Sequence, residues 1–313
     1  MKETVTVNRL PCRTWNFLKV NETVLPWPKT APQKEEVVYR AAPGERVGPI
    51  YQKLKTPSAE YGETVFRILA EPDSRLTLFL GVCPDRSARV RLEVTLKARA
   101  KVNICWLLCP QGGAVLRQEV AAVCEEETEL SVLGVMTGSG RLLTDRKIEL
   151  RGKKASFTDE EAYRFSGADE LDGNIEVVHF GPQSQSRISW KGALEQAAQK
   201  IFRGTIDFRK GCSGSVGGEE ETVLMLGEDA VNKTVPLILC DEEKVDGTHG
   251  ATIGEMDEET LFYFESRGID REAAKDFMAR SLTDRVCRMT GDAVFWEWTH
   301  DGQDNHDEKE ETE

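Results

Sequence analysis

The sequence predicts a mainly β protein that ends in a small helical part, and three observations predict it. Between about residues 63 and 240, apolar and polar residues alternate in many short runs, such as 90–96 and 130–135, with the period of half-buried strands. Between 63 and 190 no amphipathic helical pattern interrupts these runs, which disfavours a doubly wound α/β fold. After residue 257 the apolar residues recur with the period of a helix.

The first 60 residues contain seven of the twelve prolines, which interrupt regular backbone hydrogen bonding. We therefore expect residues 1–60 to be an irregular, Pro-rich entry segment without long regular elements. Trp15 and Trp27 lie among these prolines and are expected to pin the segment against the main body. The β core is expected to span residues 61–253. Periodicity alone leaves open whether it is a sandwich, a barrel or a β-helix.

Two helices are expected within residues 254–290. Asp257 precedes Glu258, Glu259 and an apolar run, the pattern of a helix N-cap followed by an acidic first turn. Gly268 is expected to close this helix, and Asp270 to cap a second one that runs to about Met289. The predicted apolar stripe of the second helix consists of Ala274, Phe277, Met278, Leu282, Val286 and Met289. The pattern leaves open whether this stripe packs on the protein's own core or on a partner.

The last segment, residues 291–313, is expected to be an acidic, disordered tail. Residues 301–313 contain seven acidic residues and one lysine, too little apolar surface to offset the entropy of ordering. The aromatic residues at 294–298 are expected either to add a last short strand or to stay loosely ordered.

Composition excludes several classes of function. The formal net charge of −13 argues against nucleic-acid and membrane partners. The sequence has neither a run of about 18 apolar residues nor an N-terminal secretory signal, so a cytoplasmic location is expected. The eight cysteines are scattered singly and are expected to be reduced. The sequence contains no phosphate-binding loop, nucleophile elbow or zinc-protease motif, so we expect no bound nucleotide and no enzymatic activity.

Six motifs in order give the chain a resemblance to the SufB/SufD family of iron–sulfur cluster assembly proteins. The resemblance is close over about 110 residues and looser near the N-terminus. The motifs are His179-Phe180-Gly181-Pro182, Phe202-Arg203-Gly204-Thr205-Ile206, Leu224-Met225-Leu226, Thr234-x-Pro236, His249-Gly250-Ala251-Thr252-Ile253-Gly254 and Leu261-Phe262-Tyr263-x-x-Ser266-Arg267-Gly268-Ile269. Upstream, Leu10-Pro11-x-Arg13-Thr14-Trp15 is the looser N-terminal similarity.

The resemblance implies a right-handed parallel β-helix core followed by a small helical domain. It also implies a scaffold subunit of the Suf machinery, on which a nascent, transient iron–sulfur cluster forms. The implied partners are a SufC-type ABC ATPase, docked on the helical domain, and a SufB-type subunit or a second copy of this chain, paired end to end. Whether a flavin binds stays open.

Two departures place the chain nearer to SufD. Ala230 stands where SufB-type chains carry a cysteine, and Gly250 stands where they carry a glutamate after the motif histidine. The N-terminal region is short for SufD, however, and the residues at 219–221 are acidic where the family often has amides. A reduced, homodimeric form therefore stays open as an alternative.

His249 is the expected cluster-assembly residue and candidate metal ligand, because imidazole binds iron and the residue belongs to a family motif. The alternative is a histidine that hydrogen-bonds the turn before the first helix. His179 is expected to be a structural histidine within a strand, and Cys212 and Cys240 are expected to be structural cysteines. The candidate anchors for the ATPase, whose alternative role is to cover the end of the β-helix, are Leu261, Phe262, Phe277 and Met278.

Two other functions compete with the cluster scaffold. The first is a purely structural partner of the ATPase that never contacts the cluster. The second is a carbohydrate-active β-helix enzyme, which would need carboxylates clustered on one outer face. In this sequence the acidic residues are dispersed, so this enzyme is the weaker alternative.

Overall fold

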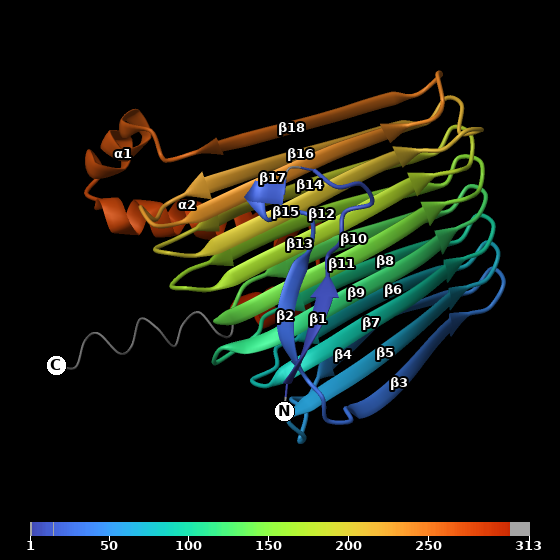
Figure 1. Ribbon diagram of the computed structural model, residues 1–313, viewed down its shortest axis with the longest axis horizontal. Coiled ribbons are helices and arrows are strands. Elements are labelled where there is room, and N and C mark those ends of the chain that lie inside the picture. The colour runs from blue at the N-terminus through green and yellow to red at the C-terminus, as the bar shows by residue number, and fades with distance from the viewer. Residues whose placement is uncertain (1, 15, 301–313) are drawn as a thin grey trace.

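The computed structural model of the protein describes residues 2–14 and 16–300. Two parallel eight-stranded sheets run through these residues, one made of the odd-numbered strands β3 to β17 and one of the even-numbered strands β4 to β18 (Figure 1). The chain crosses to the other sheet after each strand, so one coil consists of one strand from each sheet. The described residues thus form a parallel β-helix of eight coils, and the predicted mainly β fold with a β-helix core is confirmed.

The strands have similar lengths, so the coils stack in register. The odd-numbered strands are β3 (Gln33–Ala41), β5 (Tyr61–Ala70), β7 (Ser87–Leu96), β9 (Ala114–Cys124), β11 (Gly140–Leu150), β13 (Glu170–His179), β15 (Gln199–Phe208) and β17 (Val231–Cys240). The even-numbered strands are β4 (Arg46–Leu54), β6 (Arg75–Val82), β8 (Lys101–Leu108), β10 (Glu129–Met136), β12 (Ser156–Phe165), β14 (Gln185–Leu194), β16 (Val216–Met225) and β18 (Asp246–Gly254).

One corner of the β-helix is a stack of residues with left-handed backbone conformation, one from each of seven successive coils. The N–H of each donates to a carbonyl oxygen in the turn of the next coil, at 2.6–3.0 Å. Five of the seven are not glycines, although this conformation favours glycine. The seven residues are Gly44, Asp73, Arg99, Glu127, Lys154, Gln183 and Gly214.

The expectation of irregular structure in residues 1–60 is wrong for residues 33–54, which form β3 and β4, the first coil. Prolines are tolerated there because both strands are last in their sheets and need pair on one side only. Pro49 follows Gly48 at a register irregularity between Val47 and Ile50, and Pro43 and Pro57 lie between strands. The β-helix therefore begins at residue 33 rather than 61.

An N-terminal hairpin lies across the odd-numbered sheet. It consists of β1 (Lys2–Val7) and β2 (Thr23–Pro28), which pair antiparallel and are separated by a 3₁₀ turn, η1 (Asn16–Leu18). Trp27 is buried, packs edge-on against Tyr61 and lies beneath the Arg117 guanidinium at 4.7 Å. The prediction that Trp27 pins this segment to the body is confirmed, whereas Trp15 lies outside the described residues.

Three helices follow the last strand: α1 (Glu258–Glu265), α2 (Arg271–Thr290) and α3 (Ala293–His300). The predicted N-caps are confirmed, since Asp257 accepts from the Thr260 N–H and Asp270 from the Ala273 N–H. Gly268 has a φ of +81° and allows the turn between α1 and α2. Helix α2 packs on β10, β12 and β14 and so covers part of the outer face of the even-numbered sheet, while α1 and α3 both contact α2.

The predicted apolar stripe of α2 is only partly correct. The side chains that α2 buries are Ala274, Ala279, Thr283, Val286 and Cys287, whereas Phe277 and Met289 are exposed. Small residues face the sheet because they let the helix approach it closely.

The aromatic segment at 294–298 is also corrected. It forms α3 rather than a strand or a loosely ordered tail, because Phe295 is fully buried against Phe79. The rest of the expected tail, residues 301–313, lies outside the described residues. No helix in the described part of the chain is long and apolar enough to cross a membrane.

Candidate functional site

The two ends of the β-helix differ in how their edges are protected. β18 has an unpaired outer edge in the described part of the chain, all nine of its residues are exposed, and it contains no proline or lysine. At the opposite end β4 carries Pro49, a register irregularity and Lys53. Prolines, irregularities and lysines are the features that keep sheet edges from pairing with other chains. The edge of β18 is therefore the edge suited to pairing, whereas β17, the other edge strand at this end, contains Lys233 and Pro236.

His249 lies on this open edge strand. Its register partner on β16 is Glu219, which is buried inside the β-helix. Because parallel strands in register place paired side chains on the same face, His249 lies on the inward face of β18. It remains exposed because no further coil covers it in the described chain. His249 therefore stands at the mouth of the β-helix interior.

Directly beneath this mouth lies a cluster of buried charges. The Lys200 ammonium contacts the Glu221 carboxylate, and both side chains are completely buried. Thr234 donates its hydroxyl to Glu221 Oε2 at 2.5 Å. Burial raises the pKa of Glu219 to about 7, although Lys200 opposes the shift. Burial also lowers the pKa of Lys200 well below its ordinary value. This cluster can therefore take up or release protons near neutral pH.

A second buried cluster lies deeper in the interior. Arg146 Nη1 lies 2.9 Å from Asp159 Oδ2 and 2.7 Å from Glu161 Oε1. Trp106 Nε1 donates to Glu161 Oε1 at 3.0 Å, and the Arg146 guanidinium lies 4.5 Å from the Trp106 ring. Burial raises the pKa of Glu161 to about 8, with the Arg146 charge opposing. The β-helix interior thus combines an apolar core with a chain of buried ionisable groups.

Glycines make room for the buried carboxylates. A Cβ atom at Gly134 would come within 1.9 Å of Glu161 Oε2, and one at Gly204 within 2.1 Å of Glu219 Oε2. Any larger residue at either position would displace the carboxylate. Glycine is therefore required at both positions because a carboxylate lies against the backbone, and not because the chain turns there.

The four predicted helix anchors separate into two groups. Leu261 is buried, with 3% of its surface exposed, and so supports α1 from within. Phe262 and Phe277 are 69% and 59% exposed, and Met278 is half-buried. Exposed aromatic rings on a helix pair are typical anchors for a partner's groove, so Phe262 and Phe277 keep this predicted role. Leu261 is instead buried and stabilises the packing of α1.

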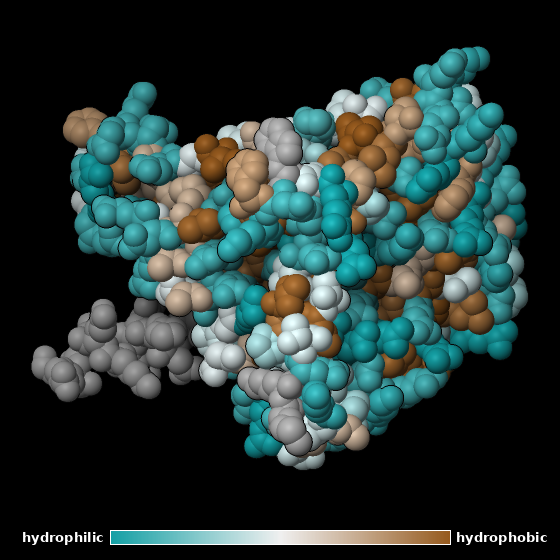
Figure 2. Space-filling model, in the orientation of Figure 1, coloured by the Kyte–Doolittle hydropathy of each residue, from teal (hydrophilic) through white to brown (hydrophobic). Residues whose placement is uncertain are grey.

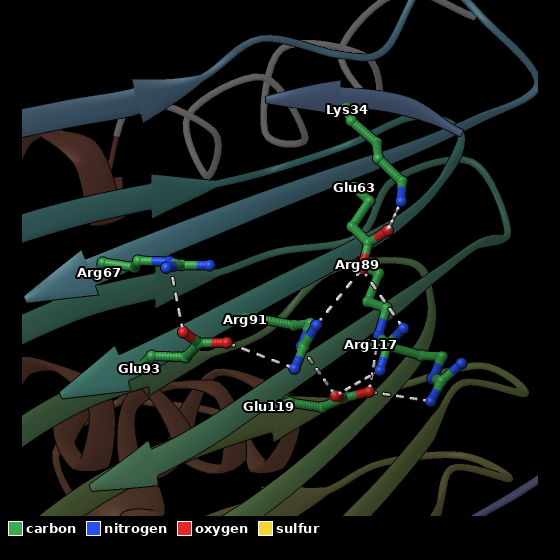
Figure 3. Close-up of polar contacts among 8 residues, drawn as sticks. All are labelled: Lys34, Glu63, Arg67, Arg89, Arg91, Glu93, Arg117 and Glu119. Carbon is green, nitrogen blue, oxygen red and sulfur yellow. Dashed lines mark hydrogen bonds and ion pairs between the residues drawn. The ribbon is translucent and has the colours of Figure 1, made fainter. Parts of the chain in front are cut away.

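The outer face of the odd-numbered sheet carries a charged network across β3 to β9 (Figure 3). Arg89 Nη2 lies 2.7 Å from Glu119 Oε2, and Arg117 Nη2 lies 2.9 Å from Glu119 Oε1. Glu63 pairs with Arg89 at 3.3 Å and Lys34 at 3.8 Å. Three glutamates, Glu63, Glu93 and Glu119, thus gather on this face, although the sequence predicted dispersed acidic residues. Each is neutralised by arginine, unlike the acid–base pair of a glycosidase. The same face is largely hydrophilic in Figure 2.

The other candidates from sequence, His179, Cys212 and Cys240, differ in their surroundings. His179 is fully buried and shares hydrogen bonds with the Ser184 and Ser186 hydroxyls at 2.8 and 2.9 Å, which confirms its structural role. Burial lowers its pKa to about 4. Cys212 is buried, as expected of a structural cysteine. Cys240 is exposed at the end of β17, where its thiol donates to the Glu242 carbonyl oxygen at 3.0 Å, so the expectation that it is a structural core cysteine is wrong.

Sequence reasoning missed the buried charges as a site. The signal was present, because Asp159 and Glu161 occupy inward positions of a strand whose other inward residues are Phe157, Tyr163 and Phe165. A charged residue at an apolar position of the strand period is expected to be buried and paired.

Together these features define a β-helical protein whose last coil is open and polar inside. Residues 58–282 match the family model described as SUF system FeS cluster assembly, SufBD core domain. This match covers more than half of the chain, and the chain belongs to the SufB/SufD family.

Individual relatives match over shorter segments. The iron–sulfur cluster assembly protein SufD of Bacillus subtilis is 36% identical over 100 residues, 32% of this chain and 23% of the relative. SufB of the same organism is 24% identical over 156 residues, 50% of this chain and 34% of the relative. A SufBD family protein of Staphylococcus aureus is 27% identical over 115 residues, 36% of this chain and 25% of the relative. The matched segments thus span about a quarter to a third of these relatives.

Proposed function

We propose that this chain is a non-enzymatic scaffold subunit for iron–sulfur cluster assembly. Its partners in this proposal are a SufC-type ABC ATPase and a second β-helical subunit. The proposal rests mainly on the open edge of β18, with His249 at the polar mouth of the last coil. Family membership supports a role in cluster assembly. The higher identity of the matched segment to SufD than to SufB favours the SufD side.

In this proposal the cluster is cargo, and His249 supplies one ligand to it. Imidazole nitrogen and thiolate sulfur are the usual protein ligands of such clusters. Among residues 2–14 and 16–300, no three His, Cys, Asp or Glu side chains gather in a way that could hold a metal ion. The remaining ligands would therefore come from a second subunit paired along β18. That subunit is a SufB-type chain or a second copy of this one.

The neighbouring charges support this role for His249. Glu219, its register partner, has a pKa raised to about 7 by burial. It can accept a proton when a thiol or imidazolium near the mouth loses one to bind metal. The ATPase would dock on the exposed rings of Phe262 on α1 and Phe277 on α2; α1 packs on α2, and α2 packs on the outer face of the even-numbered sheet. Because α2 contacts β14, movement of the helices would be transmitted to the coils near the mouth. A cytoplasmic location stays a prediction.

The test is anaerobic co-expression with the cognate ATPase, with and without a SufB-type subunit. Size-exclusion chromatography and iron and sulfide analysis follow. We expect a stable complex that holds iron and sulfide, and its subunit ratio distinguishes a homodimer from a heterodimer. His249→Ala should lower the iron and sulfide content without dissociating the complex. Thr252→Ala, on the same strand, is the matched control and should leave the content unchanged.

Three outcomes would contradict parts of the proposal. A complex that forms without iron or sulfide would indicate a purely structural partner of the ATPase. Full cluster content in His249→Ala would remove this histidine from the ligand set. Activity on polysaccharides would indicate the carbohydrate-active alternative, against which the arginine-paired carboxylates of the outer face argue.

A further inference from the structure

Two cysteines far from the mouth lie side by side on adjacent coils. Cys83 directly follows β6 and Cys109 directly follows β8, and these strands pair in register with Val82 opposite Leu108. The Cys109 N–H donates to the Val82 carbonyl at 2.9 Å, and the Gln111 N–H donates to the Pro84 carbonyl at 2.9 Å. The ladder thus continues past both cysteines, which places their backbones about 4.8 Å apart.

Both thiols point to the outside of the β-helix. Val82 and Leu108, the preceding residues, belong to the interior core, and successive residues of a strand face opposite sides. Cys83 is exposed and Cys109 is half-buried, so a small oxidant can reach the pair. The strand spacing falls within the Cα separation of about 4.4–6.8 Å that a disulfide requires. Closing the bond therefore needs rotation of side chains and little movement of the backbone.

The hydrogen bonds around the pair distinguish the two sulfurs. Cys109 Sγ accepts from the Cys83 thiol and from Gln111 Nε2, and these two bonds lower the pKa of Cys109. The same contact raises the pKa of Cys83, which keeps the shared proton, while the Lys53 charge opposes this shift. Cys109 is thus the better nucleophile of the two, because the thiolate is the reactive form.

The buried cysteines have different surroundings. Burial raises the pKa of Cys105 and Cys124 to about 12 and that of Cys287 to about 11. Such thiols stay protonated, and they lie away from solvent. We therefore expect these three buried thiols not to compete with Cys83 and Cys109 for an oxidant.

We propose that Cys83 and Cys109 are a redox-active thiol pair that a peroxide converts to an intramolecular disulfide. The Cys109 thiolate attacks one peroxide oxygen, the O–O bond breaks, and the leaving hydroxide takes up a proton to become water. The resulting sulfenic acid is attacked by Cys83 sulfur, which loses its proton while the S–OH bond breaks to release a second water. Two thiols are oxidised and one peroxide is reduced to two waters. A dithiol reductant reverses the reaction by exchange.

The disulfide would join the loops that follow β6 and β8. These loops lie next to the surface on which α3 packs, since Cys109 packs against the apolar cluster that contains Phe295. Oxidation would therefore tie together the two coils that carry α3. Because the link restricts the unfolded chain between residues 83 and 109, it should raise the melting temperature by roughly 5 °C.

The experiment treats the reduced, purified full chain with an equivalent of hydrogen peroxide and measures intact mass, free thiols and melting temperature. We expect the loss of two thiols and about 2 Da per chain, a peptide pair linked through residues 83 and 109, and complete reversal by dithiothreitol. Cys83→Ser and Cys109→Ser should each abolish the 2 Da loss. Cys12→Ser and Cys240→Ser, which remove other exposed thiols, should leave it unchanged.

The proposal is overturned if Cys83→Ser still loses 2 Da or if the wild-type chain forms only intermolecular disulfides. It is equally overturned if oxidation stops at a sulfinic acid on one cysteine. Cys83 is exposed, so its serine variant should fold, and its unperturbed melting temperature before oxidation verifies this. None of these readouts depends on the cluster-assembly function.

Discussion

Arg203 on β15 and Asp172 on β13 form an ion pair beneath the N-terminal segment. Arg203 Nη1 lies 2.5 Å from Asp172 Oδ1, and Arg203 Nε donates to the Val20 carbonyl oxygen. Asp172 also accepts hydrogen bonds from Asn8 and Thr23. Arg203 is fully buried and Asp172 is 5% exposed. The arginine of a family motif thus holds the N-terminal segment against the last coils.

Replacing Arg203 by alanine should destabilise the protein by about 3–5 kcal/mol, because it leaves the buried Asp172 carboxylate without its counter-charge. Urea unfolding followed by circular dichroism measures this as a lower midpoint. Arg99→Ala is the control, since Arg99 and Asp73 form an exposed pair and exposed pairs contribute little. Its midpoint should stay close to that of the wild type. An Arg203→Ala midpoint equal to the control would contradict a structural role for the pair.

Glu161 should make stability depend on pH. Burial raises its pKa from the ordinary 4.5 to about 8, so between these values the folded state holds a proton that the unfolded state has lost. The free energy of unfolding should therefore fall as pH rises through this window, by up to about 1.4 kcal/mol per pH unit from this group.

Glu161→Gln tests this pH dependence, because the amide keeps an acceptor for Arg146 but does not titrate. Unfolding midpoints between pH 5 and 8 should decline less steeply in this variant than in the wild type. Glu127→Gln, at an exposed corner, should retain the wild-type slope. Identical slopes in all three proteins would show that Glu161 titrates normally.

Leu261 and Phe262 are adjacent on α1 but should respond to truncation in opposite ways. Leu261→Ala removes a buried side chain and should lower stability by about 2–4 kcal/mol. Phe262→Ala removes an exposed ring and should leave stability almost unchanged while weakening ATPase binding at least tenfold. Thermal unfolding and titration calorimetry with the ATPase measure the two effects. If Phe262→Ala binds as tightly as the wild type, α1 is not a docking element.

Gly250→Lys should block pairing along β18 without unfolding the chain. A Cβ at Gly250 meets no atom within 4 Å, whereas a lysine on a sheet edge opposes pairing with another strand. Analytical ultracentrifugation should show loss of the paired species. Val38→Lys places the same charge on an exposed position of β3 at the opposite end and should not disturb assembly. Loss of pairing in Val38→Lys alone would move the interface to that end.

Local patterns predicted most of the strands and the first two helices, whereas the arrangement of the strands as a β-helix was implied only by the family resemblance. Strands from 63 onwards follow from their period of two, and the caps at Asp257 and Asp270 follow from short-range side-chain to backbone bonds. The first coil was not predicted, because prolines argue against strands unless the strands lie at a sheet edge, and the sequence does not show that β3 and β4 are edge strands. Helix α3 was missed because its helical form depends on packing against Phe79, a residue far away in sequence.

The site was predicted less completely than the fold. Motif similarity identified His249, but its inward orientation follows only from the register of β18 with Glu219. The buried charged residues were not predicted, because a charged residue in a strand usually indicates the solvent-exposed face of the sheet. Their partners lie on other strands or coils, as Trp106 and Glu161 show, and no local pattern reveals such pairing.

The left-handed corner has a consequence for how the length of this protein can change. Each corner N–H bonds to the turn of the following coil, so consecutive turns must stay aligned. Inserting a few residues within a strand would shift one turn past its neighbour and break this ladder. Adding or removing one whole coil, with its corner residue, would leave every remaining turn aligned. Length variation by complete coils is therefore the tolerated route, and it would move the open mouth along the axis while the chemistry of the last coil is kept.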